Sequence, residues 1–319
     1  MRRVLVTHVE SPVGRRVAKA LFHDPDVGLV VGLGTGAEPS FLAPYRGKVA
    51  YQRLDLAKAR HLQSFLHSER FARVRPDSVI HLPFAAEQSG ERVPGGVHTL
   101  VSETRRLVEE CAEQRGIDRF VYLSSAFVYE PVPGNGNVIS ESQLLGFEGE
   151  RDPLVRAWID ADLVCQGELH GPSLCMTILR AATIVTEAGD FLNSPPLAHR
   201  DAALGYDPML AVVSDRDVAR ALVLALHADR PGIYNIAGNE VFPRSQLAAG
   251  APRSTLAFGA LALAERLWRR APPPSRDFDR YGMVPSARLA AETLGFEPQY
   301  RIEVRGSGAA RRIDTIRCR

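Results

Sequence analysis

Short apolar runs alternate with longer segments of helical period along most of this chain, and this alternation restricts the fold more than any other feature. The runs have the length of buried strands and lie at residues 2–8, 27–33, 49–54, 78–84, 119–125, 173–181 and 231–238. Between the first two runs, Val13, Val17 and Leu21 recur on one face of a predicted helix. Strands that alternate with helices form parallel sheets through βαβ units. We therefore predict an α/β fold with a doubly wound parallel sheet.

Composition and charge narrow the class of partner. The 319 residues are 45% hydrophobic, enough for a sizeable core, and the 39 Lys and Arg residues nearly balance the 37 Asp and Glu residues. Because the net charge is only +2, we expect no nucleic acid and no membrane as partner. The arginine-rich segment 311–319 is expected to be a solvated tail. The first apolar run is too short for a signal peptide or a membrane span, which predicts a cytoplasmic protein.

The cysteines argue against a metal centre. Cys111, Cys165, Cys175 and Cys318 lie far apart, and none takes part in a CxxC or Cys/His spacing. Isolated thiols of this kind are typical of buried or incidental cysteines. We predict no metal site.

Two regions depart from the strand–helix alternation. Residues 130–150 are rich in proline, glycine and asparagine, which predicts an exposed loop. Residues 239–319 combine a long apolar-periodic segment at 256–270 with a triple proline. The predicted division is a larger domain at residues 1–185 and 208–238 and a smaller lobe at residues 186–207 and 239–319. Ligands of open α/β sheets bind at the carboxyl edge of the strands, so loop and lobe would enclose a small-molecule substrate.

Several segments resemble one known family in the same order along the chain. They are VIHLPF (79–84), RFVYLSSAFVYE (119–130), TILRAATIV (177–185), DRDVARALVLAL (215–226) and GIYNIAG (232–238). Over nearly its full length the chain resembles the extended short-chain dehydrogenase/reductases (SDRs) of the NAD-dependent epimerase/dehydratase group. The resemblance implies a Rossmann-like NAD(P)-binding domain, a smaller C-terminal substrate-binding lobe, and NAD or NADP as cofactor. It also implies a homodimer through a four-helix interface formed by residues 97–115 and 152–171.

The phosphate loop of the family departs from its pattern in this chain. TGxxGxxG corresponds to residues 7–14, and of its glycines only Gly14, which serves helix–strand packing, is kept. His8 and Ser11 replace the glycines that allow the tight turn and the close approach of a diphosphate. Glu10 adds a negative charge beside the predicted phosphate position. We therefore predict a loop that binds phosphate poorly.

The same loop still starts a helix, and neighbouring residues leave alternatives open. Ser11 followed by proline makes a good N-cap and first helical residue. His8 is either a donor to an anion or a turn histidine. Gly34 stands where NAD-binding relatives place an acid for the ribose, and Asp55 is either an adenine-contacting acid or a helix N-cap. The degenerate cofactor-binding set implied by the resemblance is Thr7, His8, Ser11, Gly14 and Asp55.

The catalytic positions implied by the resemblance are also altered. Ser125 matches the serine of the family and Tyr129 follows at the expected spacing, but the tyrosine and lysine of YxxxK fall on Trp158 and Asp162. An indole donates a hydrogen bond but cannot act as a general acid or base near neutral pH. No Tyr or Lys lies between residues 130 and 172, so a shift of register does not restore the pair. Conventional hydride transfer is therefore predicted to be lost.

Three functions compete. The first is a non-redox enzyme, an isomerase, cyclase or lyase, in which Ser125 and Tyr129 hold a substrate oxygen. Its acid or base would be Asp162 or Asp160 with a raised pKa, against the alternative that both aspartates are simply solvent-exposed. The second is a non-catalytic binding or regulatory protein. The third is an NAD(P)-dependent oxidoreductase or epimerase with atypical cofactor contacts, which the dipole of the first helix would support.

The predicted substrate pocket draws on residues far apart in the sequence. Its members are Trp158, Phe84, Arg180, Tyr206 and Asp207. Trp158 is expected to form an aromatic wall. For Arg180 an ion pair at a strand end is the alternative to contact with a ligand, and for the segment around Asp207 a rigid turn is the alternative.

Overall fold

The computed structural model describes most of the chain. The described residues are 1–83, 96–114, 116–132, 138–146, 152–194, 207–247, 281–306 and 311–318. The predicted apolar segment at 256–270, together with Phe84 and Tyr206, lies outside them.

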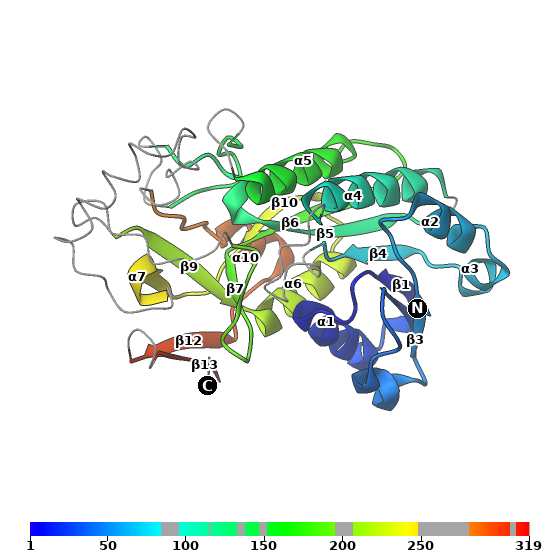
Figure 1. Ribbon diagram of the computed structural model, residues 1–319, viewed down its shortest axis with the longest axis horizontal. Helices are drawn as coiled ribbons and strands as arrows, with labels where there is room; N and C mark the ends of the chain where they lie inside the picture. The colour runs from blue at the N-terminus through cyan, green and yellow to red at the C-terminus, as the bar shows by residue number, and fades with distance from the viewer. Residues whose placement is uncertain are drawn as a thin grey trace, which may run out of the picture.

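The predicted parallel sheet is the centre of the molecule (Figure 1). Its seven strands follow the order β10-β6-β5-β4-β1-β2-β3, and every neighbouring pair is parallel. Their bounds are β1 Arg2–Val6, β2 Val27–Gly34, β3 Val49–Arg53, β4 Ser78–His81, β5 Arg119–Ser125, β6 Cys175–Ala181 and β10 Gly232–Ile236. All residues of β5 are buried because helices cover both faces. The Rossmann-like doubly wound fold is confirmed.

Helices lie on both faces of this sheet. Figure 1 shows α4 and α5 above it and α1 and α6 below it. The helices are α1 Pro12–His23, α2 Ala59–Leu66, α3 Glu69–Val74, α4 Gly96–Glu113, α5 Pro153–Gly167, α6 Asp215–His227, α7 Arg244–Leu247 and α10 Arg288–Leu294, with the 3₁₀ turns η1 Ser40–Tyr45 and η3 Ala126–Val128. The predicted apolar face of α1, Val13, Val17 and Leu21, is buried against the sheet.

Helix α1 begins where the sequence predicts. Ser11 is its N-cap, and the Ser11 hydroxyl oxygen accepts a hydrogen bond of 3.0 Å from the N–H of Gly14. Pro12 occupies the first helical turn, where its missing N–H does no harm. The start of α1 is therefore fixed by side-chain capping within the loop itself.

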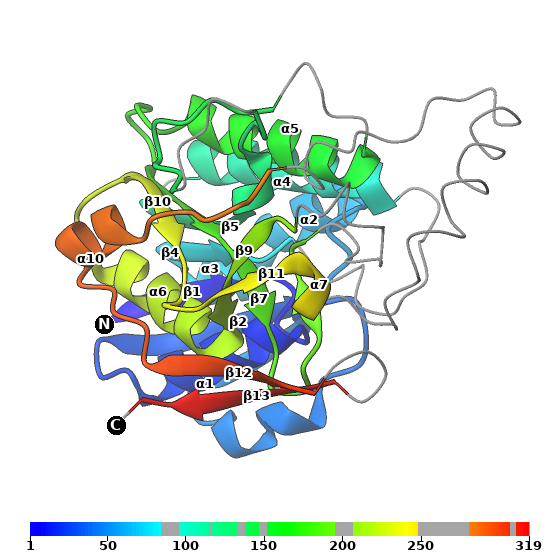
Figure 2. The ribbon, with the colours of Figure 1, turned by 90° about the vertical axis from the view of Figure 1, so that its left-hand side faces the viewer.

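A second sheet and a hairpin complete the fold (Figure 2). The second sheet has the order β11-β9-β7-β8, and the hairpin pairs β12 with β13. The bounds are β7 Thr183–Val185, β8 Phe191–Leu192, β9 Met209–Ser214, β11 Val241–Pro243, β12 Tyr300–Arg305 and β13 Arg312–Arg317. The prediction of a solvated tail at 311–319 is therefore wrong for residues 312–317, because this segment pairs along the whole of β12.

A buried carboxylate fixes the hairpin to α6. Asp217 is fully buried, and its oxygens accept hydrogen bonds from the N–H groups of Gln299 at 2.8 Å and Tyr300 at 3.0 Å. The hydroxyl of Ser214, the N-cap of α6, donates to the same carboxylate at 2.9 Å. The Asp217 side chain thus joins α6, which covers the main sheet, to the start of β12.

Within the described ranges, no helix is long and apolar enough to cross a membrane, and no group of three or more His, Cys, Asp or Glu residues is arranged to hold a metal ion. Cys111 and Cys165 are buried as free thiols, Cys175 is half-buried, and Cys318 is exposed.

Candidate functional site

The chain reverses its direction of winding between β1 and β4, which are neighbours in the sheet. Ligands of open α/β sheets bind at the carboxyl ends of the strands at such a switch point. Residues 7–11 follow β1 there, and His81 is the last residue of β4. We take this region at the carboxyl ends of β1 and β4 as the candidate site and call it the crevice.

In the phosphate loop, backbone N–H groups donate to acceptors within the loop itself. The N–H of Ser11 donates to the carbonyl oxygen of His8 at 2.9 Å, and the N–H of Gly14 donates to the Ser11 hydroxyl. Pro12 has no N–H to offer. A Cβ added to Gly14 would lie 2.8 Å from Val9 Cα, so this glycine allows α1 to pack closely on the loop after β1, where the sequence predicted packing on a strand.

His8 is held in the crevice by a carboxylate from α4. Its backbone has φ of +47°, a left-handed conformation that favours glycine. The His8 Nε2 lies 2.5 Å from Glu103 Oε1, and the two side chains are only 11% and 8% exposed. Burial opposes a charge on the imidazole, but the Glu103 carboxylate outweighs it and raises the pKa of His8. The raised pKa favours the protonated imidazole, so the pair is a nearly buried dyad held by a short hydrogen bond.

A second histidine lies beside this dyad, and its pKa is shifted in the opposite direction. The ring centroids of His8 and His81 are 6.4 Å apart. His81 is fully buried between two hydroxyls, with Nδ1 2.9 Å from Thr7 Oγ1 and Nε2 3.0 Å from Thr104 Oγ1. Burial lowers the pKa of His81 to about 4, so it is neutral at physiological pH.

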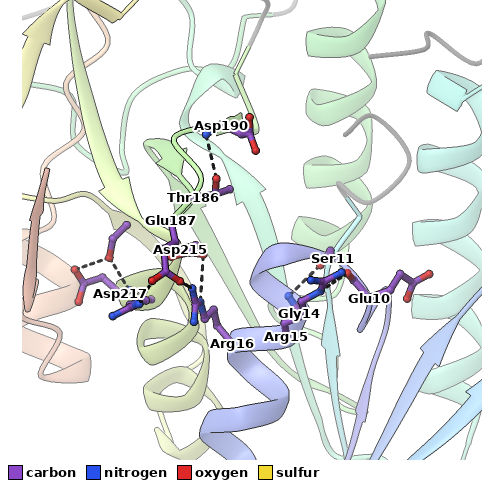
Figure 3. A network of polar contacts seen from close by, with 12 residues as sticks. Glu10, Ser11, Gly14, Arg15, Arg16, Thr186, Glu187, Asp190, Asp215 and Asp217 are labelled. Atoms are coloured by element: carbon purple, nitrogen blue, oxygen red, sulfur yellow. Dashed lines mark hydrogen bonds and ion pairs between the residues drawn. The ribbon is translucent and has the colours of Figure 1, made fainter. Parts of the chain in front are cut away.

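Glu10 points away from the helix terminus. Figure 3 shows its carboxylate extending to the side of the loop opposite Ser11 and Gly14. There Glu10 Oε1 accepts a hydrogen bond of 3.1 Å from the N–H of Thr35, just past the end of β2. The charge of Glu10 therefore lies at the end of β2 rather than over the first turn of α1.

Asp55 stabilises the turn before α2. Its Oδ1 accepts from the N–H of Ala57 at 3.1 Å, and its Oδ2 lies 3.2 Å from Lys58 Nζ. The N-cap of α2 is Lys58, so the alternative that Asp55 is this N-cap is wrong by three residues. Whether Asp55 contacts a ligand stays a prediction.

A polar network fixes α1 against α6 (Figure 3). Arg16 on α1 donates from Nε to Asp215 Oδ2 at 3.3 Å and from Nη2 to Glu187. Arg216 Nη2 donates to the other oxygen of Glu187 at 2.7 Å. Burial raises the pKa of Asp215 despite these arginines. The helix that begins at the crevice is thus anchored to the loop after β7 and to α6.

Asp162, at the lysine position of the family, is sealed inside the molecule. It has no exposed surface, and Arg180 on β6 donates to its two oxygens at 2.6 and 3.0 Å. Ser124 Oγ donates to Oδ2 at 2.5 Å and Gln166 Nε2 to Oδ1 at 2.7 Å. The alternative that Asp162 is solvent-exposed is wrong, and for Arg180 the predicted ion pair at a strand end is confirmed.

Tyr129 belongs to the same buried network as Asp162 and Arg180. The Arg180 guanidinium lies 4.8 Å from the centroid of its ring, and its hydroxyl donates to Asn235 Oδ1 at 2.7 Å. Burial raises the pKa of Tyr129 to about 12, so the phenol stays protonated. Ser125 is also buried, and its hydroxyl donates to the carbonyl oxygen of Asn193 at 2.8 Å.

The remaining predicted site residues are separated. Trp158 on α5 is buried in the core, and Asp160 is half-buried with its carboxylate 3.1 Å from Arg156 Nε. Asp207 accepts a hydrogen bond of 3.0 Å from the N–H of Ser245 at the start of α7. The structure thus brings Asp162, Arg180 and Tyr129 together and leaves Asp160 and Asp207 apart from them.

Sequence reasoning missed Glu103. The signal is present, because Glu103 and Thr104 interrupt the apolar stripe that Leu100, Leu107 and Cys111 form along α4. Polar side chains inside an apolar helix face are buried with partners or serve a site.

Comparisons with known proteins agree with this fold. The model of the NAD dependent epimerase/dehydratase family matches residues 4–187. Uncharacterized proteins of Mycobacterium tuberculosis and Mycobacterium bovis are 24% identical over 99% of this chain and 87% of theirs. The fold and the family model define the class as an extended SDR, and the chain belongs to the NAD-dependent epimerase/dehydratase family.

Solved structures of the family share the whole fold. A dTDP-glucose 4,6-dehydratase of Streptomyces venezuelae, crystallised with NAD, has a TM-score of 0.66 at 19% identity and covers 93% of this chain and 92% of its own. A UDP-glucuronic acid 4-epimerase of Bacillus cereus in complex with NAD has a TM-score of 0.61 at 16% identity, with coverages of 93% and 94%. At these identities the likeness concerns the fold.

Proposed function

We propose that this protein binds a small molecule in the switch-point crevice without hydride transfer, as an SDR-fold binding or regulatory protein. The observation that carries this proposal is the sealed carboxylate of Asp162. A group that exchanges protons with a substrate must reach it, whereas Asp162 has no exposed surface and its oxygens are filled by Arg180, Ser124 and Gln166.

The neighbouring groups offer no substitute at this position. Trp158 cannot act as a general acid or base near neutral pH. Tyr129 is buried, and its raised pKa keeps the proton on the phenol. The replaced side chains support a rigid framework around β5 and do not reproduce the chemistry of the family.

A dinucleotide also fits the loop poorly. The family neighbours hold NAD, and a diphosphate at such a helix terminus is bound by free backbone N–H groups. Here the N–H groups of Ser11 and Gly14 are bonded within the loop, and Pro12 has none. The residues present therefore do not match the diphosphate of the cofactor.

The test is a turnover and binding assay on the purified chain. NAD is added with UDP-glucuronic acid or dTDP-glucose, the nicotinamide absorbance is followed, and the sugar nucleotide is recovered for analysis. We expect neither reduction of NAD nor a changed sugar. Conversion of either sugar nucleotide, or NADH formation, would contradict the proposal.

One observation favours a second candidate, a non-redox enzyme. The His8–Glu103 dyad lies at the switch point, and the pKa of its imidazole is raised whereas that of the adjacent His81 is lowered, a pattern found where protons are transferred. This candidate predicts that a bound sugar nucleotide incorporates deuterium at carbon when incubated in heavy water, and that Glu103→Gln abolishes the exchange. No exchange in the wild type argues for the binding protein.

The homodimer stays a proposal. Helices α4 and α5 pack side by side on one face of the sheet (Figure 1), as the four-helix interface would require. Light scattering on the protein as it elutes from a size-exclusion column distinguishes a dimer from a monomer.

A further inference from the structure

The turn at residues 8–11 is joined to α4 by one polar contact. In the part of the chain that the structure describes, the hydrogen bond of 2.5 Å between His8 Nε2 and Glu103 Oε1 is the only one that connects this turn with α4. Both side chains are nearly buried, so water competes little for the contact. The position of the turn relative to α4 therefore depends on this pair.

The same contact holds a strained backbone. The φ of +47° at His8 is a left-handed conformation, which a residue with a side chain adopts only at a cost. The carbonyl oxygen of His8 accepts from the N–H of Ser11 at 2.9 Å, and the N–H of Val9, in the same peptide unit, donates to the carbonyl oxygen of Leu33 at 3.1 Å. If the imidazole leaves Glu103, a return of His8 to an ordinary conformation rotates this peptide unit and breaks both hydrogen bonds.

We propose that the His8–Glu103 pair is a pH-sensitive latch, which holds the turn at residues 8–11 closed against α4 in mildly acidic and neutral solution and releases it in alkaline solution. The turn lies at the carboxyl ends of β1 and β4, so the latch controls access to the crevice. The inference rests on the proposed function in one respect, because that function places the ligand in the crevice.

The charges around His8 give the latch its dependence on pH. Burial opposes a proton on the imidazole, but the carboxylates of Glu103 on α4, Glu10 in the turn and Asp55 after β3 outweigh burial and raise the pKa of His8. The other titratable group that faces His8 among the described residues is His81 on β4, at 6.4 Å between ring centroids. Burial lowers the pKa of His81 to about 4, so it already lacks a proton in this range of pH.

The direction of the effect follows from the raised pKa. In the open turn, solvent returns the imidazole of His8 toward its ordinary pKa of about 6.5. The closed turn is therefore favoured most below that value, and the preference is lost as the pH rises through the pKa of the closed form. A neutral imidazole still donates to Glu103, but more weakly than a charged one. The latch thus loosens at high pH.

The test is amide hydrogen exchange on the full chain, resolved to single residues by NMR. Each rate is compared with the intrinsic rate at the same pH, which removes the effect of pH on the exchange reaction. We expect the protection of the Val9 and Ser11 N–H groups to fall about fivefold or more between about pH 6 and about pH 8.5, as the donor to Glu103 loses its charge. The N–H of Leu154, capped by the Asp152 carboxylate at 2.9 Å at the start of α5, is the internal reference and should keep its protection.

Two variants separate the latch from a general loss of stability. Glu103→Gln leaves the imidazole a neutral partner, so the protection of the turn should no longer depend on pH. His8→Asn tolerates the left-handed backbone but has no titratable group, so protection should be below that of the wild type at about pH 6 and independent of pH. Glu109→Gln, at an exposed position of α4, is the matched control and should keep the pH dependence of the wild type.

Several outcomes overturn the latch. They are equal protection of Val9 and Ser11 at both pH values in the wild type, a pH dependence that Glu103→Gln retains, and a midpoint that differs from that of the His8 imidazole titrated by NMR in the same samples. The wild-type measurements decide even if a variant fails to fold. Since they need neither ligand nor NAD, the latch can fail while the crevice still binds a small molecule. The turnover assay tests the proposed function by itself.

Discussion

In both halves of the crevice the sequence departs from the pattern that the family resemblance implies, but the structural results are opposite. Around α5 and β6 the substituted side chains bond one another completely, so that Asp162, Arg180 and Tyr129 leave no reactive group at the surface. At the ends of β1 and β2, charged groups remain near the surface, and Glu10 keeps an oxygen without a donor. The first half has become framework, whereas the second keeps the properties of a site.

The largest expected effect tests the framework half. Asp162→Ala leaves the buried Arg180 guanidinium without its partner, and breaking such a pair from one side destabilises a protein by about 3–5 kcal/mol. Urea unfolding followed by circular dichroism measures the loss. In the control Asp160→Ala, the carboxylate that is removed lies 3.1 Å from Nε of the exposed Arg156. This variant should change stability by less than about 1 kcal/mol. Equal effects of the two variants would show that the pair is not structural.

The next effect concerns the dyad and depends on pH. The pKa of His8 is raised in the folded protein and that of Glu103 is lowered. The His8 contribution is therefore complete below its unfolded pKa of about 6.5 and is lost as the pH rises through the folded value. The Glu103 contribution is present above its unfolded pKa of about 4.3 and is lost as the pH falls through the folded value.

We therefore expect Glu103→Gln to destabilise the protein by about 1–3 kcal/mol between about pH 5 and 6.5, with a smaller difference at higher pH. Unfolding curves at several pH values measure it. Glu109→Gln, on an exposed position of the same helix, serves as the control. A difference that grows with rising pH would contradict a charged His8.

The third prediction concerns the ability of the phosphate loop to bind NAD. In His8→Gly with Ser11→Gly, the N–H of Gly14 loses its internal acceptor and the imidazole no longer spans to Glu103. We expect the affinity for NAD to rise at least about tenfold, or about 1.4 kcal/mol, as measured by calorimetry. Ser68→Gly removes an equivalent N-cap at α3 and should leave the affinity unchanged. If the double variant binds NAD no better than wild type, the loop is not what disfavours the cofactor.

The smallest effect tests the close approach of Glu10 to Gly34, because a Cβ added to Gly34 would lie 2.8 Å from Glu10 Cδ. Gly34→Ala should shift the Glu10 carboxylate and cost about 1 kcal/mol of stability. In a Glu10→Gly background the same change should be nearly neutral, so the double-mutant cycle yields a coupling of about 0.5 kcal/mol or more. Thermal unfolding of the four proteins measures it. Additive effects would place the two side chains apart.

The sequence predicted the framework better than the site. The period of Val13, Val17 and Leu21 predicts a buried helix face, and the capping by Ser11 follows from residue type, because both depend on neighbours along the chain. The pairing of His8 with Glu103 joins residues 95 positions apart, which no local pattern encodes. The direction of the Glu10 side chain depends on its rotamer and on its hydrogen bond with the N–H of Thr35. The sequence therefore predicts the charge of Glu10 beside the phosphate position, whereas the structure places it at the end of β2.

The carboxylate of Asp217 has a consequence for how this protein folds while it is synthesised on the ribosome. Its acceptors are filled by the N–H groups of Gln299 and Tyr300, and α6, on which it lies, packs against the crevice helix α1. Helix α6, which supports α1, therefore lacks two of its hydrogen-bond donors until residues 299 and 300 are in place. Synthesis from the N-terminus can form the first strands early, but α6 reaches its final contacts only after residues 299 and 300 have been made.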